Sequence, residues 1–156
     1  MSKPHDTVLV LDFGGQYSHL IARRIRECEV YSELVPWNAS ADQIQARKPK
    51  AVVLSGGPAS VNDQNAPRCE RAVLDIGLPV LGICYGLQLM VDLLGGKVKR
   101  PSVQEYGRTT VYFDDHSDLF RGLGNESTCW MSHADSADTL PDRFEGTAHS
   151  KHAKYA

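Results

Sequence analysis

Short apolar runs recur along the first half of the chain and predict the strands of a parallel sheet. Such runs are too short for buried helices, and unbroken apolar character is typical of strands that are buried on both faces. Val8–Leu11, Ala51–Leu54 and Pro79–Ile83 each run into a turn that contains glycine, and Tyr31–Val35 is closed by Pro36. We therefore predict four buried strands.

The segments between these strands carry helical patterns. Apolar residues recur at helical spacing in a first helix, at Leu20, Ile21, Ile25 and Cys28. Three more helices are expected at Asp42–Arg47, Asn65–Ile76 and Tyr85–Leu94. Because strands and helices alternate, the expected fold class is three-layer α/β/α, with a mostly parallel central sheet covered on both faces.

Beyond residue 97 the apolar runs become shorter and polar turns separate them. Strands are expected at Lys97–Val98, Thr109–Phe113 and Cys129–Ser132. We interpret them as an antiparallel extension or edge of the sheet. No internal repeat or low-complexity tract interrupts residues 1–156, which predicts one continuous domain.

Composition narrows the classes of partner. A net charge of −2 gives no electrostatic reason to expect nucleic acid or an acidic membrane. No apolar stretch follows the N-terminal lysine, and no later run is long enough to span a bilayer, so a cytoplasmic location is expected. The four cysteines form no CxxC pair, which argues against a zinc ribbon or a redox dithiol and predicts no metal site.

Cys84 is the most unusual of the four cysteines. It lies in the run Gly82-Ile83-Cys84-Tyr85-Gly86, between a predicted strand and a predicted helix, as a nucleophile does in an elbow turn. The helix N-terminus would favour the reactive thiolate, and the N–H of Tyr85 would point toward an oxyanion. The alternative is a small buried core cysteine. The glycines on both sides, and polar Gln88 on the same helix face, favour the nucleophile.

A second oxyanion donor is expected at Gly56-Gly57, because the carboxyl ends of parallel strands converge at one edge of the sheet. The glycine pair exposes backbone N–H groups without side chains, although a plain tight turn before Pro58 is the alternative. The run Asp12-Phe13-Gly14-Gly15 ends another strand at the same edge, with no assigned role.

These runs resemble the N-terminal glutamine amidotransferase domain of bacterial-type GMP synthase, a class I amidotransferase of flavodoxin-like fold. The resemblance covers nearly the whole chain and includes Leu11–Arg24, Leu54–Ser60, Leu81–Gln88, Leu94–Val98, Glu105–Gly107 and Trp130–Asp135. The elbow and the Gly-Gly-Pro turn are shared by the wider class. The Asp-Phe-Gly start and the Trp-Met-Ser-His stretch are similar to GMP synthase in particular.

The resemblance implies that Cys84 hydrolyses glutamine through a glutamyl thioester. It implies oxyanion-hole N–H groups from Gly57 and Tyr85. The remaining substrate-binding residues that it implies are Gly56, Gln88, Ser132, His133 and Asp135. No cofactor is expected in this domain. The ammonia would pass to a synthetase domain or subunit that uses ATP and Mg²⁺ to convert XMP to GMP, and such proteins are often homodimeric.

Two departures from the family pattern affect the expected activity. The family's general base lies in a His-Pro-Glu run, which residues 1–156 do not contain, and we expect the chain to stop before it. His133 is followed by an acid two residues later, but its surroundings match the substrate loop. We therefore predict that residues 1–156 fold poorly or have little glutaminase activity. Ala134 replaces the family's usual glycine and is expected to narrow the glutamine pocket.

Three other interpretations stay open. Another cysteine hydrolase could use the same elbow, and a chain without its base could serve as a regulatory or ammonia-gating partner. The run Asp114–Asp118 could imitate a metal site, but contiguous polar residues in a turn are more often simply solvated.

Overall fold

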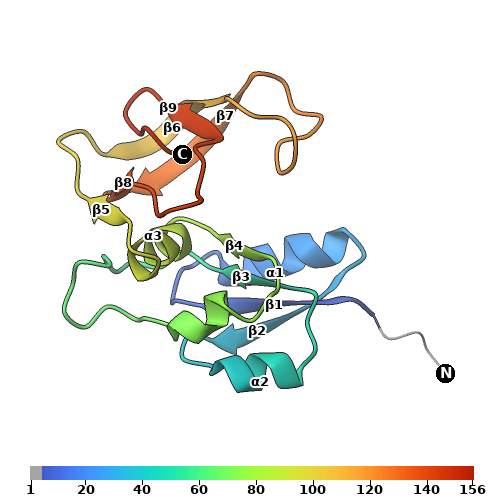
Figure 1. Cartoon of the computed structure of the whole chain (residues 1–156). Coiled ribbons are helices and arrows are strands. Elements are labelled where there is room, and N and C mark those ends of the chain that lie inside the picture. Colours follow the sequence, from blue (N-terminus) through green and yellow to red (C-terminus); the bar gives the residue numbers. More distant parts are fainter. Residues whose placement is uncertain (1–4) are drawn as a thin grey trace. The chain divides into compact units, whose positions relative to one another are not determined.

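The computed structural model describes residues 5–156 in two compact units (Figure 1). The first unit ends at Met90 and the second begins at Val91, so the division falls within helix α3 (Tyr85–Leu93). The two units differ in architecture, because the first contains a parallel sheet and the second contains antiparallel sheets.

A four-stranded parallel sheet forms the centre of the first unit, in the order β2-β1-β3-β4. Its strands are β1 (Thr7–Asp12), β2 (Tyr31–Pro36), β3 (Ala51–Leu54) and β4 (Val80–Gly82). All four predicted strands are thus confirmed, and so is the α/β fold with a parallel central sheet. β1 pairs with both β2 and β3, and Val10 lies beside Leu34 on one side and Val53 on the other.

The two central strands of this sheet, β1 and β3, are buried on both faces. Helix α1 (Ser18–Glu27) packs on one face, where Ala22 joins Val10 and Val53 in a core cluster. Leu9 and Val52 point to the opposite face and are fully buried as well. Unbroken apolar strands are required for this arrangement, since every residue of a strand then faces protein.

The first helix forms as predicted, and Ile21 and Ile25 of its predicted apolar face pack against the core cluster. Leu20 and Cys28 are exposed, however, and Ser18 and Ala22 are buried instead. Cys28 lies one residue beyond the last helical turn, where Glu29 adopts a φ of 61° and ends the helix. Its predicted place on the apolar face was therefore wrong.

The predicted helix at Asn65–Ile76 was also wrong. The segment contains only η1, a single 3₁₀ turn at Arg71–Leu74, and Cys69 lies before it in irregular structure. In the described part of the chain, the carbonyl of Pro67 makes no helical hydrogen bond. It accepts one from the Tyr85 hydroxyl at 2.5 Å. By contrast, α2 (Ala41–Ala46) forms where expected, with a capping box between Ser40 and Gln43.

The second unit contains two antiparallel sheets. One pairs β5 (Lys97–Lys99) with β8 (Ser136–Thr139), and the other places β6 (Glu105–Phe113) between β7 (Glu126–His133) and β9 (Ala148–Ser150). The predicted antiparallel strands are thus confirmed, but within residues 5–156 they pair only with one another and form sheets separate from the parallel one. β8 and β9 were not predicted, because strands of three or four partly polar residues carry no apolar run.

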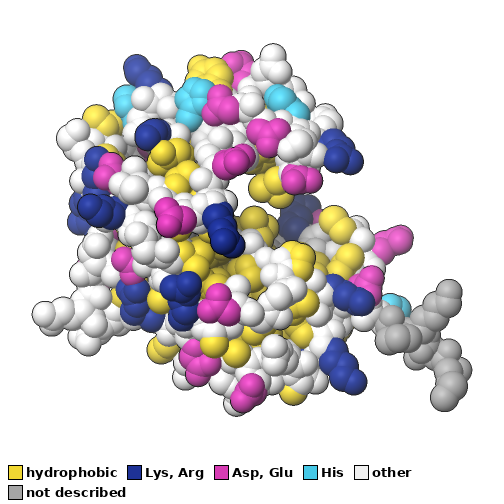
Figure 2. All heavy atoms as spheres, in the orientation of Figure 1, with side chains coloured by type: hydrophobic (Ala, Val, Ile, Leu, Met, Phe, Trp, Pro, Cys, Tyr) yellow, Lys and Arg dark blue, Asp and Glu magenta, His cyan; other side chains and the backbone are white. Residues whose placement is uncertain are grey.

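Charge is mixed on the surface. Figure 2 shows basic and acidic side chains interspersed over the visible face of the molecule. In the part of the chain that the structure describes, no helix has both the length and the apolar character needed to cross a bilayer.

Candidate active site

Cys84 occupies a strained turn between β4 and α3. Its φ is 49°, in the left-handed region that residues other than glycine rarely adopt. The helix begins at the next residue, and the cysteine itself is exposed. This geometry is that of a nucleophile elbow, in which backbone strain presents the side chain at the end of a strand.

The glycines on both sides of Cys84 let the strand, the turn and the helix approach one another. A Cβ on Gly82 would lie 2.6 Å from the Cα of Leu87, and a Cβ on Gly86 would lie 2.2 Å from the carbonyl oxygen of Leu54. Real Cβ atoms do not approach backbone atoms so closely. The elbow therefore needs glycine at both positions, as the sequence indicated.

The Gly56-Gly57 turn lies directly beside the elbow. A Cβ on Gly56 would be 3.5 Å from the Cβ of Cys84, and the N–H of Ile83 donates to the Leu54 carbonyl at 3.0 Å. The end of β3 and the end of β4 therefore meet at the thiol. This is the convergence that the sequence predicted from parallel strands.

Tyr85 is held firmly in place at the start of α3. The residue is 2% exposed, and its hydroxyl donates to the Pro67 carbonyl at 2.5 Å. Its ring packs against the ring of Phe13, with 5.4 Å between the centroids. Contacts at both ends of the side chain fix the position of the Tyr85 backbone, and so of its N–H.

Gln88 lies one helical turn after Cys84, and its N–H donates to the carbonyl of Cys84 at 3.0 Å. The side chain is buried, as Leu89 and Met90 beside it are. An amide in such a setting is retained for its hydrogen bonds rather than for its packing.

Burial raises the pKa of the Cys84 thiol above its ordinary value. Although the residue is exposed, nearby protein atoms displace part of the water that would solvate the thiolate. Desolvation by burial is the cause of the shift. The direction is opposite to the one expected from the helix N-terminus alone.

The other three cysteines are also free thiols, and each differs from Cys84 in its setting. Cys28 is exposed beyond the end of α1, and Cys129 is half-buried in β7. Cys69 is buried, and burial raises the pKa of its thiol. None of the three has a positive φ, so Cys84 alone has the geometry of an elbow.

The predicted substrate residues Ser132, His133 and Asp135 lie in the second unit. The first two end β7, with Ser132 exposed and His133 half-buried. Asp135 is 5% exposed, and its carboxylate accepts a hydrogen bond from Nε of Arg100 at 3.0 Å. An ion pair therefore orients this acid.

Glu105 had no assigned role in the sequence, although the run Glu105–Gly107 matched the family. Its carboxylate is buried and accepts a hydrogen bond from the Ser150 hydroxyl. The other carboxylate oxygen lies 3.4 Å from Nε2 of His133. Glu105, in β6, thus connects His133 at the end of β7 to Ser150 in β9. This link exists only because β6 pairs with both β7 and β9.

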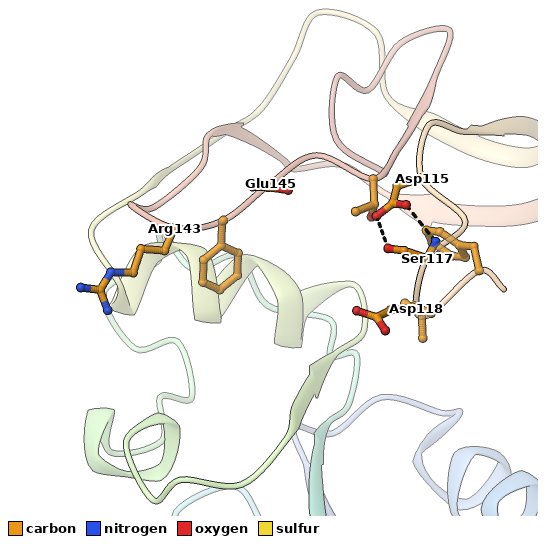
Figure 3. A pocket seen from close by; sticks show the side chains of 9 residues that line it. Asp115, Ser117, Asp118, Arg143 and Glu145 are labelled. Atoms are coloured by element: carbon orange, nitrogen blue, oxygen red, sulfur yellow. Dashed lines mark hydrogen bonds between the residues drawn. The ribbon is translucent and has the colours of Figure 1, made fainter.

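From the run Asp114–Asp118, the residues Asp115, Ser117 and Asp118 line a pocket of the second unit (Figure 3). Asp115 accepts hydrogen bonds from the backbone N–H and the hydroxyl of Ser117, at 2.8 and 2.7 Å. Arg143 and Glu145, from the segment of this chain that precedes β9, line the same pocket. Among residues 5–156, no group of three or more His, Cys, Asp or Glu side chains is arranged to hold a metal ion.

A parallel α/β sheet with a cysteine elbow beside a glycine pair is the arrangement of a nucleophile-elbow site between a strand and a helix. Comparison with known families agrees, because residues 9–156 match the model of the class-I glutamine amidotransferases. The chain belongs to the class-I glutamine amidotransferase family.

Curated relatives carry a more specific name. The chain is 49% identical over 156 residues to GMP synthase [glutamine-hydrolyzing] of Heliobacterium modesticaldum, covering 100% of the chain and 30% of that protein. It is 53% identical over 143 residues to the same-named protein of Synechocystis sp., covering 92% of the chain and 26% of that protein. The chain thus spans under a third of the length of these relatives.

Solved structures resemble the whole described fold. A structure assigned as a GMP synthase subunit of Thermoplasma acidophilum superposes with a TM-score of 0.86 at 29% identity, covering 97% of this chain and 76% of that one. A glutamine amidotransferase of Thermotoga maritima gives a TM-score of 0.74 at 20% identity, covering 98% and 70%. The second likeness bears on the fold alone.

Proposed function

We propose that this chain is the glutamine-hydrolysing part of a GMP synthase, with Cys84 as its nucleophile. The observation that carries the proposal is the strained φ of 49° at Cys84, directly beside the Gly56 turn, in a chain about 50% identical to proteins with that name. Strain of this kind persists only where the surrounding structure enforces it, and it is typical of active sites.

The proposed reaction begins with attack of the Cys84 thiolate on the side-chain amide carbon of glutamine. The S–C bond forms, and the carbonyl π electrons move to oxygen, where the N–H groups of Gly57 and Tyr85 would stabilise the charge. Protonation of the amide nitrogen releases ammonia and leaves a glutamyl thioester. Water then hydrolyses the thioester to glutamate and restores the thiol.

Proton transfer is the step that residues 1–156 support least. They contain no His-Pro-Glu run, and burial raises the pKa of the Cys84 thiol instead of lowering it. Losing a positioned base costs about 10²–10⁴-fold in rate. We therefore expect residues 1–156 alone to bind and trap glutamine-like electrophiles much better than they turn over glutamine.

Recognition of glutamine is proposed to involve Gly56 and Gln88 of the first unit, where the buried Gln88 amide has the chemistry to bind an amino acid's charged end. Ser132, His133 and Asp135 of the second unit stay predictions from the family resemblance, and the Asp135 carboxylate is paired with Arg100. We further propose that the ammonia serves a synthetase domain or subunit in the cytoplasm, which uses ATP and Mg²⁺ to aminate XMP. The relatives, which are more than three times as long as this chain, support a partner of that kind.

A diazo-ketone analogue of glutamine tests the proposal without requiring turnover. We expect intact-protein mass spectrometry to show one label at Cys84, with excess glutamine slowing the reaction. Cys84→Ala should abolish the label, whereas Cys28→Ala removes an equally exposed thiol and should leave it unchanged. Labelling that glutamine does not slow would contradict a glutamine site and favour another cysteine hydrolase.

A second candidate is a regulatory or ammonia-gating partner without glutaminase activity, which the raised pKa of the Cys84 thiol favours because less of the reactive thiolate then forms. The two candidates differ when the chain is mixed with a synthetase subunit, XMP, ATP and glutamine. A glutaminase should produce GMP that disappears with Cys84→Ala. A regulatory partner should change the synthetase rate on added ammonia, and Cys84→Ala should keep that effect.

A further inference from the structure

The loop after β1 carries a partly buried hydrogen-bond network next to the proposed oxyanion hole. Asp12 accepts two hydrogen bonds through Oδ1, from the Gly14 N–H at 2.9 Å and from the Ser18 hydroxyl at 2.7 Å. Ser18 is 1% exposed, so its hydroxyl depends on protein partners. The carboxylate is the strongest acceptor within its reach, because a charged acceptor forms the shorter and stronger bond.

The network continues from α1 to the end of β3. Oγ of Ser18 lies 3.2 Å from Oγ of Ser55, and Ser55 accepts the N–H of Phe13 at 3.0 Å. Ser55 is fully buried and directly precedes Gly56. The polar contacts thus lead from the Asp12 carboxylate through the Ser18 hydroxyl to the Ser55 hydroxyl, which also lies 3.0 Å from the carbonyl oxygen of Gly56 in the glycine turn.

Close packing transmits this arrangement to both proposed oxyanion donors. A Cβ on Gly57 would lie 2.6 Å from the Phe13 carbonyl oxygen, and a Cβ on Gly15 would lie 2.4 Å from the Gly56 carbonyl oxygen. The glycine turn is therefore seated against the loop after β1. On its other side, the Phe13 ring packs against the ring of Tyr85, whose N–H is the second proposed donor.

We infer that Ser55, Ser18 and Asp12 are positioning residues that fix the oxyanion hole, an inference that rests on the proposed function. Oxyanion donors act only within a few tenths of an ångström of their best position, and an error of about 1 Å costs roughly 10²-fold. The loop after β1 holds the Gly57 N–H through backbone contact and the Tyr85 N–H through the Phe13 ring. A partly buried polar network suits this task because it permits a single arrangement.

The test separates reactions that need an oxyanion hole from one that does not. The probe is 5-oxopentanoate, which has the glutamine side chain's length and an aldehyde in place of the amide. Attack by the Cys84 thiolate forms an S–C bond, moves the carbonyl π electrons onto oxygen and takes one proton from water. ¹³C NMR of the labelled aldehyde carbon gives the dissociation constant. Alkylation by iodoacetamide displaces iodide at saturated carbon and forms no oxyanion.

We expect Ser55→Ala and Ser18→Ala to weaken the aldehyde adduct by about tenfold or more, with the iodoacetamide rate at Cys84 unchanged. Ser32→Ala is the matched control: Ser32 is also fully buried, and its hydroxyl donates to the Ala22 carbonyl at 2.7 Å. It should change neither measurement. Asp12→Asn keeps the size of the side chain but weakens the acceptor, and should weaken the adduct by about threefold.

Each remaining outcome counts against the inference. An adduct of wild-type strength in Ser55→Ala, or equal losses in adduct and alkylation, overturns the positioning role alone. If Ser55→Ala and Ser18→Ala do not fold, an unchanged adduct in Asp12→Asn overturns it. A wild-type chain that forms no adduct at Cys84 and no glutamine-sensitive diazo-ketone label overturns the proposed function and the inference together.

Discussion

Replacing Gly86 by alanine should change the stability of the chain in two opposite ways, through helix propensity and through steric overlap. Gly86 is the second residue of α3, where alanine is favoured over glycine by about 1 kcal/mol on helix propensity alone. Against this, the new Cβ would lie 2.2 Å from the carbonyl oxygen of Leu54 and 2.7 Å from its Cβ. Leu54 is the last residue of β3 and is fully buried, so it cannot move aside freely.

The steric effect should outweigh the propensity. Overpacking of this kind costs about 1–3 kcal/mol, and contact with backbone atoms of a central strand places Gly86→Ala at the upper end, about 3 kcal/mol. After subtracting the propensity, we expect a net loss of about 2 kcal/mol in the free energy of unfolding. For a chain of this length that lowers the Tm by roughly 4–8 °C.

Thermal unfolding followed by circular dichroism measures this effect. Gly124→Ala is the control, because a Cβ there would meet nothing within 4 Å and its backbone needs no positive φ. It should leave the Tm unchanged within experimental error. A Gly86→Ala chain that melts at or above the wild-type Tm would refute the close approach of β3 and α3 on which the elbow depends.

Three further predictions follow from the site. The raised pKa of Cys84 should make its alkylation by iodoacetamide increase about tenfold per pH unit up to about pH 8, because only the thiolate reacts and its fraction grows until the pH exceeds the pKa. Rates corrected with Cys84→Ser that level off below pH 8 would contradict it. Gly56→Ala should keep the Tm within roughly 2 °C of the wild-type value, since its Cβ would lie at an ordinary 3.5 Å from the Cβ of Cys84. It should nevertheless slow diazo-ketone labelling of Cys84 severalfold. A labelling rate equal to that of the wild type would place the substrate elsewhere. Ser150→Ala should lower the free energy of unfolding in urea by about 1–3 kcal/mol, because it leaves the buried Glu105 carboxylate without its hydroxyl donor. Glu105→Gln in the same background should recover part of that loss. An unchanged free energy of unfolding in Ser150→Ala would show that the carboxylate is solvated.

The strands and the elbow were predictable because their signals are local. Val8–Leu11 and Ala51–Leu54 are unbroken apolar runs, and glycines at 82 and 86 flank Cys84 within one turn. Burial of both strand faces and tight passage of the backbone each demand particular residue types at adjacent positions. For the same reason, the pairing of Gly56-Gly57 with the elbow could be inferred from parallel topology.

Features that depend on distant partners were missed. Leu20 looks apolar and periodic but is 43% exposed, because the register of α1 on the sheet selects Ser18 and Ala22 instead. Leu81 lies in a predicted buried strand, yet it is 41% exposed because β4 is the edge strand of the described sheet. Neither outcome can be read from nearby residues, since both depend on which surfaces meet.

The sequence by itself determined that a cysteine elbow would stand at the end of a parallel strand beside a glycine turn, and which family the chain resembles. Only the tertiary structure decided the desolvation that raises the pKa of the Cys84 thiol, the Asp12–Ser18–Ser55 network behind the glycine turn and, in the second unit, the link between Glu105 and His133. The physical reason is how far apart in the sequence the interacting residues lie. Backbone strain and close approach constrain neighbouring residues, whereas solvation and hydrogen bonding depend on groups brought together from segments far apart in the chain.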